Sequence, residues 1–184
     1  MTQPHRPGRD IPLLETQRLY MRPVRISDAS TLYRLHTDPL VVELTSAGTA
    51  MTRAQSDERL RLYLREWQEY GFGFFIVYEK QANGDLVFAG RCGLRSLDRD
   101  DVELGYCFTM AASGRGLATE AAQQLVDFAF FACGMRRLVG LVRPANAPSV
   151  RVLHKIGFAY HSTGTYRDAV YRRYELAAPL PRPS

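Results

Sequence analysis

The sequence predicts an α+β (α/β/α) fold, in which helices cover both faces of a central, mixed, mostly antiparallel sheet of about seven strands with about four helices. The first observation is the order of the expected elements, β-αα-βββ-α-β-α-ββ, which has too few crossovers for a doubly wound parallel sheet. The second is the strong hairpin signal Asn83-Gly84-Asp85. The third is an apolar strand over residues 102–110 that runs through a glycine loop into a long helix.

The first expected elements are one strand and two helices. Residues 18–25 alternate between apolar and polar side chains, which is typical of a half-buried strand. Ser27 or Asp28 can cap a helix that continues to about residue 36, and Asp38-Pro39 is expected to end it. Thr52 is a suitable N-cap for a second helix over residues 52–69, whose large apolar side chains fall on one face.

The middle of the chain predicts a hairpin, a third strand and the longest helix. Residues 73–79 and 86–95 form the hairpin, and residues 102–110 form the strand beside it. The helix covers residues 115–133, and Gly134 is suited to its C-cap.

The last expected elements complete the sheet. Residues 137–143 predict a strand, and residues 147–156 predict a short helix that Asn146 can cap. Residues 157–163 and 169–177 predict a final antiparallel pair.

Length and composition indicate one domain. A chain of 184 residues, 46% apolar and 23% charged, is typical of a soluble globular domain with a substantial core. We expect flexible tails at residues 1–11 and 179–184 around a single domain over residues 12–178. No apolar run is long enough for a membrane span, and the polar start lacks the apolar segment of a signal peptide. We therefore expect a cytoplasmic protein without a membrane partner.

The remaining composition argues against several classes of site. The three cysteines, Cys92, Cys107 and Cys133, are widely spaced and fit small buried side chains better than a disulfide framework or a zinc site. The four histidines show no ligand spacing, so no metal is expected. The net charge is +5, with no dense basic run, so we expect no nucleic-acid partner. The charge could still attract an anionic small ligand.

The loop between residues 108 and 120 predicts an anion site. Gly114 and Gly116 have no Cβ, which lets an anionic group approach the main chain, and the following helix presents unpaired N–H groups. Arg115 adds a positive charge at the rim. A tight turn would also explain two glycines. The P-loop and the dinucleotide fingerprint do not fit, because their lysine and their third glycine are missing.

The segment Gly114-Arg115-Gly116-Leu117-Ala118-Thr119-Glu120 resembles the pyrophosphate loop of the GNAT superfamily of acetyl-CoA-dependent N-acetyltransferases. Ser113 stands where that loop begins with Gln or Arg. Other segments, in the same order along the chain, resemble the ribosomal-protein N-terminal (alanine/serine) acetyltransferase branch. These segments are residues 14–23, 71–77, 90–94, 102–106 and 146–158.

The resemblance implies the GNAT fold, in which the fourth and fifth strands, here 102–110 and 137–143, splay apart. Their gap would hold the pantetheine arm of acetyl-CoA, with the diphosphate on the main chain from Ser113 to Thr119. The cofactor-binding residues it implies are Phe108, Thr109, Met110, Ser113, Gly114, Arg115, Gly116, Leu117, Ala118, Thr119, Asn146 and Ser149.

Glu103 is the candidate catalytic base. A carboxylate between Val102 and Leu104 in an apolar strand is unexpected, and the resemblance implies a base at this position. The alternative is a carboxylate that pairs with an arginine, such as Arg95 or Arg143, and only stabilises the sheet.

Ser149 is the candidate acid. Many GNAT enzymes use a tyrosine seven residues after the asparagine that corresponds to Asn146, but Leu153 occupies that position here. The resemblance to the ribosomal-protein branch implies a serine three residues after the asparagine, which is Ser149. Its alternative role is to satisfy a backbone group in the first turn of the helix. Asn146 can cap that helix and reach the pantetheine amide, and the main chain at Phe108 is the expected oxyanion donor.

The resemblance implies direct transfer of an acetyl group from acetyl-CoA to a primary amine, either a protein N-terminus or a small amine, through a ternary complex. A second hypothesis is a catalytically silent acyl-CoA sensor or interaction module. The protein could be a monomer or a homodimer. Candidates for the acceptor pocket are residues 40–45, Trp67, Phe72, Phe74, Tyr166 and Tyr171, with Glu43 or Asp168 as a possible site for a cationic acceptor.

Overall fold

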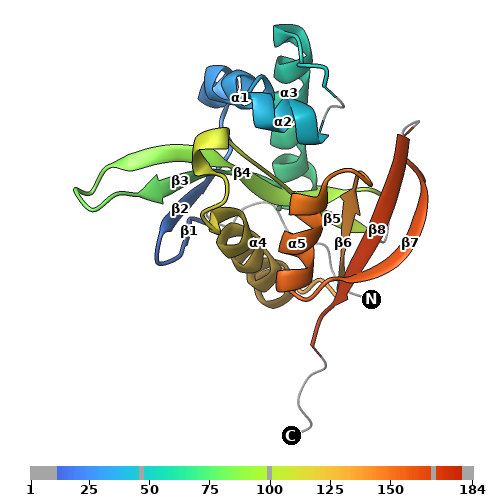
Figure 1. Ribbon diagram of the computed structural model, residues 1–184. Coiled ribbons are helices and arrows are strands. Elements are labelled where there is room, and N and C mark those ends of the chain that lie inside the picture. Colours follow the sequence, from blue (N-terminus) through green and yellow to red (C-terminus); the bar gives the residue numbers. More distant parts are fainter. Residues whose placement is uncertain (1–11, 46–47, 99–100, 167–168, 180–184) are drawn as a thin grey trace, which may run out of the picture.

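The computed structural model describes residues 12–45, 48–98, 101–166 and 169–179. One sheet of eight strands forms its centre, in the order β1-β2-β3-β4-β5-β6-β8-β7 (Figure 1). Every neighbouring pair is antiparallel except β5 and β6, which are parallel. The predicted fold class is therefore confirmed, with a short extra strand at the N-terminal edge.

The strands follow the predicted segments closely. They are β1 (Leu14–Glu15), β2 (Leu19–Pro23), β3 (Phe74–Lys80), β4 (Leu86–Ser96), β5 (Val102–Phe108), β6 (Arg137–Val142), β7 (Ala159–Tyr166) and β8 (Ala169–Ala177). The helices are α1 (Ala29–His36), α2 (Pro39–Thr45), α3 (Arg53–Tyr70), α4 (Leu117–Asp127) and α5 (Ala147–Lys155). None of the helices in these described parts is long and apolar enough to cross a membrane.

The prediction missed α2. Asp38-Pro39 does end α1, but Pro39 also begins the next helix, because a proline costs no hydrogen bond at the first helical position. The Asp38 side chain accepts a hydrogen bond from the backbone N–H of Leu40 (3.0 Å) and stabilises this start. The linker expected after α1 is therefore a helix, and the fold has five α-helices in its described residues.

The long helix after the glycine loop differs from its prediction at both ends. It begins at Leu117 rather than residue 115, because Gly116 adopts a left-handed conformation (φ +79°) that does not belong to the helix. Its last turn, Phe128–Ala132, is a π-helix. The extra residue of a π turn rotates the apolar face of this last turn, where Ala129 is buried and Ala132 is exposed.

Two hydrophobic clusters hold the layers together, one on each face of the sheet. α4 and α5 cover one face, and the cluster there includes Leu117, Leu125 and Leu153. α1 and α3 cover the other face through Leu32, Leu60 and other side chains. Figure 1 shows α4 and α5 in front of the sheet and α1 to α3 together at its upper end. This arrangement leaves the β5–β6 junction accessible between the two helical groups.

β5 and β6 meet at one end only. Their ladder contains a single residue pair, Glu103 with Val139, so the strands diverge beyond it as predicted. Asp101 holds the closed end, because its two oxygens accept from Arg137 Nη2 (2.6 Å) and Arg173 Nη1 (2.7 Å). One carboxylate thus ties β5 to both β6 and β8 where the split begins.

We expect Asp101→Asn to lower the free energy of unfolding at pH 7 by about 1–3 kcal/mol, the range for a lost charged hydrogen bond. Hydrogen bonds from Arg173, together with those from Arg137, hold the pKa of the Asp101 carboxyl below its usual 3.8. A lowered carboxyl pKa stabilises the fold above the unfolded-state pKa and ceases to do so as the pH falls. Urea titrations should therefore show the difference constant from neutral pH down to about pH 5 and shrinking below pH 4. A difference that is constant down to pH 2 would contradict this role.

Candidate active site

The first part of the site is a groove of about 420 Å³ between the end of β5, the start of α4 and one side of α5. It brings together nine of the twelve residues predicted to bind the cofactor. These nine are Phe108, Ser113, Gly114, Gly116, Leu117, Ala118, Thr119, Asn146 and Ser149. The sequence therefore identified nine of the twenty residues that line this groove, from two separate segments.

The glycine loop exposes its main chain to this groove. Gly114 (φ +73°) and Gly116 (φ +79°) are both left-handed, a conformation that favours glycine. A Cβ at Gly114 would meet no other atom within 4 Å, so the backbone is open there. The first hydrogen bond of α4 runs from Glu120 N to Gly116 O (3.1 Å), and the N–H groups of residues 117–119 precede it. These N–H groups can bind an anion.

A charged clamp fixes the start of α4. Glu120 accepts hydrogen bonds from Thr16 Oγ1, from Arg18 N (3.0 Å) and from Arg18 Nε (2.6 Å). Burial alone would raise the pKa of the Glu120 carboxyl, but these hydrogen bonds outweigh it and lower the pKa. Arg18 also donates to the carbonyl of Arg115 (2.8 Å). The β1–β2 turn thereby orients the glycine loop.

Thr109 and Met110 lie outside the residues that line the groove. The chain turns into a 3₁₀-helix at Met110–Ala112, so β5 ends at Phe108 rather than at residue 110. The Thr109 N–H donates to Ala89 O (2.9 Å), and the Met110 N–H donates to the Asp38 carboxylate (3.1 Å). Neither N–H is directed at the groove, which differs from the predicted backbone contacts at these two positions.

Arg115 also lies outside the lining. Its guanidinium forms an ion pair with Glu79 on β3, with Nη1 at 2.8 Å from Oε2. The side chain therefore anchors the loop to the sheet, whereas the sequence placed a positive charge at the rim. Glu79 could not be identified from the sequence as its partner, because the two residues are 36 positions apart.

α2 joins the two walls of the groove. At one end, Asp38 holds both the first turn of α2 and the main chain at Met110. At the other end, Leu44 O accepts a hydrogen bond from Asn146 Nδ2 (3.2 Å). Asn146 Oδ1 accepts from Ser149 N (3.1 Å), which confirms the predicted cap of α5. Asn146 is thus held at the mouth of the β5–β6 gap from both sides.

Tyr106 is a site residue that the sequence analysis missed. Ser149 Oγ donates to Tyr106 Oη (3.0 Å), and Tyr106 Oη donates to the Ser149 carbonyl (2.9 Å). Burial raises the pKa of the Tyr106 phenol well above its usual 10, so the group stays protonated. In the sequence Tyr106 resembles one more apolar strand residue. Its position could have identified it as a site residue, because Tyr106 lies two residues before Phe108 on the strand that borders the gap.

A second cavity, of about 230 Å³, adjoins the groove. The two share Leu44, Thr45, Tyr106, Asn146 and Ser149, so they meet at the open end of the β5–β6 split. The second cavity extends under α3 and contains Glu103 and Gly105 from β5. Side chains from both faces of the sheet line this cavity, because β5 and β6 diverge there and no strand separates the two faces.

Glu103 lies in this second cavity and pairs with Arg95. The register of β4 and β5 explains the pair, because Arg95 is directly opposite Glu103 and the two side chains share one face. Of the two arginines considered from the sequence, Arg95 is the partner. Its Nη2 donates to Glu103 Oε2, and the Glu103 carboxylate is only 12% exposed. The ion pair itself neither requires nor excludes a catalytic role.

Leu153 is a core residue that also borders the second cavity. It is 1% exposed and packs against Gly140 of β6, where an added Cβ would come within 2.8 Å of the leucine side chain. No hydroxyl is available from this position. Ser149, one turn earlier on α5, is therefore the residue of this helix that presents a hydroxyl to the junction.

The predicted acceptor-pocket residues divide into two groups. Those that line the second cavity are Leu44, Thr45, Phe74, Tyr166 and Tyr171. Trp67 and Phe72 do not line it. Trp67 instead packs against Phe75 and donates to Phe74 O (2.9 Å), and Phe72 stacks on Tyr70. Glu43 lines a neighbouring surface pocket, and Asp168 is outside the described residues.

The cysteines have no feature of a nucleophile. Cys92 and Cys107 are fully buried in the sheet, and burial raises their pKa values to about 12 and about 11. Burial likewise raises the pKa of the Cys133 thiol to about 11. In the described parts of the chain, no group of three or more His, Cys, Asp or Glu side chains could hold a metal ion.

The fold and the site combine a sheet that splits between β5 and β6, a groove that reaches the N–H groups at the start of α4, and a second cavity beside it. Residues 18–159 match the family model of the acetyltransferase (GNAT) domain, and the chain belongs to this family. The resemblance seen in the sequence is therefore confirmed.

Individual relatives agree with this family. The chain is 26% identical over 166 residues to the "Uncharacterized N-acetyltransferase p20" of Bacillus licheniformis, covering 89% of this chain and 88% of that protein. The acetyltransferase from Agrobacterium tumefaciens str. C58 matches the fold with a TM-score of 0.79 at 24% identity, covering 95% of this chain and 99% of that one. RimL, a ribosomal L7/L12 α-N-protein acetyltransferase in complex with coenzyme A, matches with a TM-score of 0.72 at 16% identity, covering 91% and 97%.

Proposed function

We propose that this protein transfers the acetyl group of acetyl-CoA to a primary amine by direct attack in a ternary complex. The observation that carries the proposal is the meeting of two cavities at Tyr106, Asn146 and Ser149, where β5 and β6 diverge. The groove would hold the cofactor and the second cavity the amine, so the thioester would lie at the junction. The coenzyme A in the RimL structure, which shares this fold, supports the choice of cofactor.

The groove suits the anionic part of coenzyme A. The glycine loop offers N–H groups at the start of α4 to the diphosphate. Arg151 and Lys155 of α5 line the same groove and add positive charge for phosphate groups. The pantetheine arm would continue between β5 and β6, where the divergence leaves backbone groups without a ladder partner.

Phe108 is the best placed main-chain donor for this arm or for the developing oxyanion. Successive N–H groups of a strand point to opposite edges. Because the Thr109 N–H points to β4, the Phe108 N–H points away from β4, toward the gap. A donor fixed in this direction can stabilise the negative charge of a tetrahedral intermediate.

The proposed reaction needs no enzyme nucleophile. The neutral amine attacks the thioester carbon, an N–C bond forms, and the tetrahedral intermediate expels the thiolate as the C–S bond breaks. Glu103 takes the proton of the amine, directly or through water. The Ser149 hydroxyl turns from Tyr106 toward the departing sulfur and gives it a proton, which it regains from solvent. Tyr106 is a positioning residue in this scheme.

We expect Ser149→Ala to lower kcat by about 10–100-fold, because the leaving thiolate loses its proton donor. Tyr106→Phe should lower kcat less, since it removes only the partner of Ser149. Both variants should keep the KM for acetyl-CoA close to that of the wild type. Steady-state measurement of thiol release with a reactive amine tests this. Full activity of Ser149→Ala would remove the serine from the mechanism.

The overall proposal is tested by thiol release from acetyl-CoA with a panel of amines, combined with calorimetric titration of coenzyme A. We expect coenzyme A to bind and at least one amine to accelerate thiol release. Binding without thiol release from any amine would contradict the enzyme and favour a silent acyl-CoA-binding module.

A further inference from the structure

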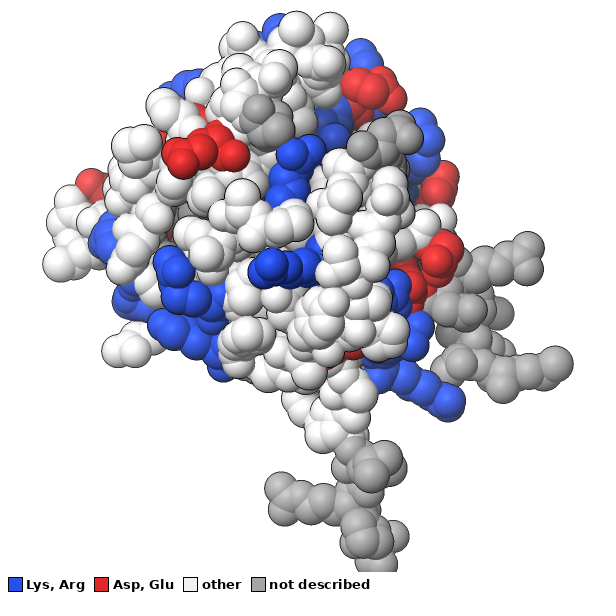
Figure 2. Space-filling view, turned by 45° about the vertical axis from the view of Figure 1, so that its right-hand side comes forward, with Lys and Arg blue, Asp and Glu red and all other residues white. Residues whose placement is uncertain are grey.

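The second cavity is lined by an unusual concentration of positive charge. Arg59, Arg91, Arg95 and Arg143 all line it, and Glu103 is its one carboxylate within the described ranges. On the face shown in Figure 2, basic side chains are visible in the central part of the surface, and acidic ones lie toward its margins. A pocket built for a cationic amine would show the opposite balance.

Arg91 is a half-buried cation, and none of the ion pairs among the described residues includes it. It shares the cavity-facing side of β4 with Arg95, four residues along the strand, and its partner in the register is Cys107, so it does not compete for Glu103. Its guanidinium lies 4.6 Å from the centre of the Phe74 ring and 5.2 Å from that of Tyr63. Its Nε is buried and has no hydrogen-bond partner. The aromatic rings stabilise the charge in part and leave its donors available.

Arg143 is a second such cation, on the opposite side of the split. It follows β6 directly, and its guanidinium lies 5.8 Å from the centre of the Tyr171 ring. Its Nε is also buried without a hydrogen-bond partner, and none of the ion pairs among the described residues includes it. Because Arg95 is balanced by Glu103, Arg91 and Arg143 give the cavity an excess positive charge.

The positive charge near this cavity also affects the pKa of a nearby histidine, His36. Burial, with the positive charges of Arg91 and Arg59, lowers the pKa of His36 to about 3. His36 is therefore neutral at physiological pH and bonds Ser56 (2.9 Å between Nδ1 and Oγ). It contributes no charge that would offset or add to that of the arginines.

Burying a guanidinium costs free energy while its N–H donors have no hydrogen-bond acceptor, and a bound anion would supply one. The planar arrangement of these donors matches the oxygens of a carboxylate or phosphate group. We propose that the amine acceptor is a small molecule that also carries a carboxylate or phosphate group, which Arg91 and Arg143 bind. The inference deepens the proposed function and rests on it. A cavity of about 230 Å³ is below the usual range for drug-sized ligands, so the molecule is small.

The same charge would favour the reaction. A positive environment disfavours the protonated form of an amine, so the acceptor nitrogen loses its proton more readily. The anionic group of the acceptor would hold the molecule in the cavity while the nitrogen faces the junction at Tyr106 and Ser149. Acetylation removes the charge of the amine and leaves the anionic group unchanged.

Matched pairs of amines test the inference. Glycine is compared with glycinamide, and O-phosphoethanolamine with ethanolamine, while putrescine represents cationic acceptors. We expect kcat/KM for at least one amine that carries the acidic group to exceed that of its partner without that group by about tenfold or more, with putrescine the poorest. The two anionic amines distinguish carboxylate from phosphate. Preference for the partners without that group or for putrescine would overturn the inference while leaving the proposed function intact.

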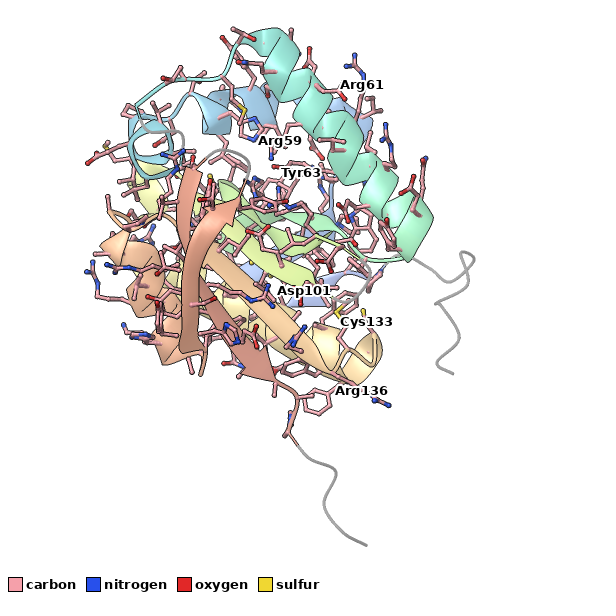
Figure 3. All side chains as sticks on the ribbon, turned by 90° about the vertical axis from the view of Figure 1, so that its right-hand side faces the viewer. Arg59, Arg61, Tyr63, Asp101, Cys133 and Arg136 are labelled. Atoms are coloured by element: carbon pink, nitrogen blue, oxygen red, sulfur yellow. The ribbon has the colours of Figure 1, made fainter. Side chains whose placement is uncertain are left out.

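Arginine variants locate the anion. Arg91→Gln and Arg143→Gln should each raise the KM of the preferred anionic amine by about tenfold or more and leave the KM of acetyl-CoA unchanged. The control is Arg61→Gln, because Arg61 is 63% exposed, pairs with Glu58 and points away from the side of α3 that carries Arg59 and Tyr63 (Figure 3). Circular dichroism melting checks that each variant folds. An unchanged KM in both folded variants would overturn the assignment of the two arginines.

If no amine releases thiol from acetyl-CoA, this result contradicts the proposed enzyme activity and not the inference of an anion-binding cavity. In that case calorimetric titration of the same amines, in the presence of coenzyme A, still decides the inference. Tighter binding of the anionic members, weakened in Arg143→Gln, would support an anion-binding cavity in a protein that does not turn over these amines. Equal binding of the partners with and without the acidic group would overturn it.

Discussion

Gly116→Val is expected to weaken coenzyme A binding by about tenfold or more, the effect of losing one or two charge-assisted hydrogen bonds. Gly116 holds φ at +79°, and a β-branched residue tolerates this conformation poorly. The main chain would move out of the left-handed region, and the N–H groups at the start of α4 would no longer converge on the diphosphate. Isothermal titration calorimetry with coenzyme A measures the effect.

Gly84→Val is the matched control for this variant. Gly84 has a similar φ of +86°, and a Cβ there would meet no other atom within 4 Å. It lies in the β3–β4 turn, outside the groove. Both variants carry the same kind of backbone strain, so both should lose a similar amount of stability. Only Gly116→Val should lose affinity. Equal affinity of the two variants for coenzyme A would contradict the phosphate-loop assignment.

Glu103→Gln is expected to lower kcat/KM by about 100-fold at neutral pH, which is at the lower end of what a general base contributes. The amide cannot accept the proton of the amine, so the reaction loses its base. The measurement is kcat/KM at neutral pH with the best acceptor.

Arg95→Gln separates catalysis from scaffolding. Each single substitution breaks the same buried ion pair and should destabilise the fold to a comparable degree. Arg95→Gln retains the carboxylate, so it should keep most of the activity. The same loss of kcat/KM in both variants would show that Glu103 only stabilises the sheet.

The fold could be predicted largely because its signals are local. The period-2 pattern of the strands, the Asn83-Gly84-Asp85 turn and the Thr52 cap depend on neighbouring residues, and each predicted its element correctly. The prediction failed where one residue serves two elements. Pro39 was interpreted as the end of a helix and also begins α2, and the π turn at Phe128–Ala132 has no sequence signal in a run of apolar residues.

The site could be predicted in part, for the same reason. The glycine loop, Asn146 and Ser149 belong to short motifs, and the structure brings them together around one groove. Contacts between distant segments were not visible. The Arg115–Glu79 pair and the Met110–Asp38 hydrogen bond span 36 and 72 positions, and both redirect residues that the loop pattern assigned to the cofactor.

Tyr106 and the arginines of the second cavity could not be recognised as site residues from the sequence, because their residue types gave no distinguishing signal. A tyrosine in an apolar strand is ordinarily a core residue, and its hydrogen bonds to Ser149 depend on how α5 docks on the sheet. Arg91 and Arg143 are two among 22 arginines, and only the β4–β5 register and the split beside β6 place them around one space. Their charge is the basis for proposing an acceptor with an anionic group, whereas Glu43 and Asp168 suggested a cationic one.

The central claim is that the diphosphate of coenzyme A binds the main chain from Ser113 to Thr119 while its thiol reaches Tyr106 and Ser149. A crystal structure of the protein with coenzyme A tests it most directly. We predict phosphate oxygens within hydrogen-bond distance of the N–H groups at the start of α4, and the sulfur between the ends of β5 and β6. Coenzyme A bound elsewhere on the protein, or with its sulfur outside this gap, would contradict the account.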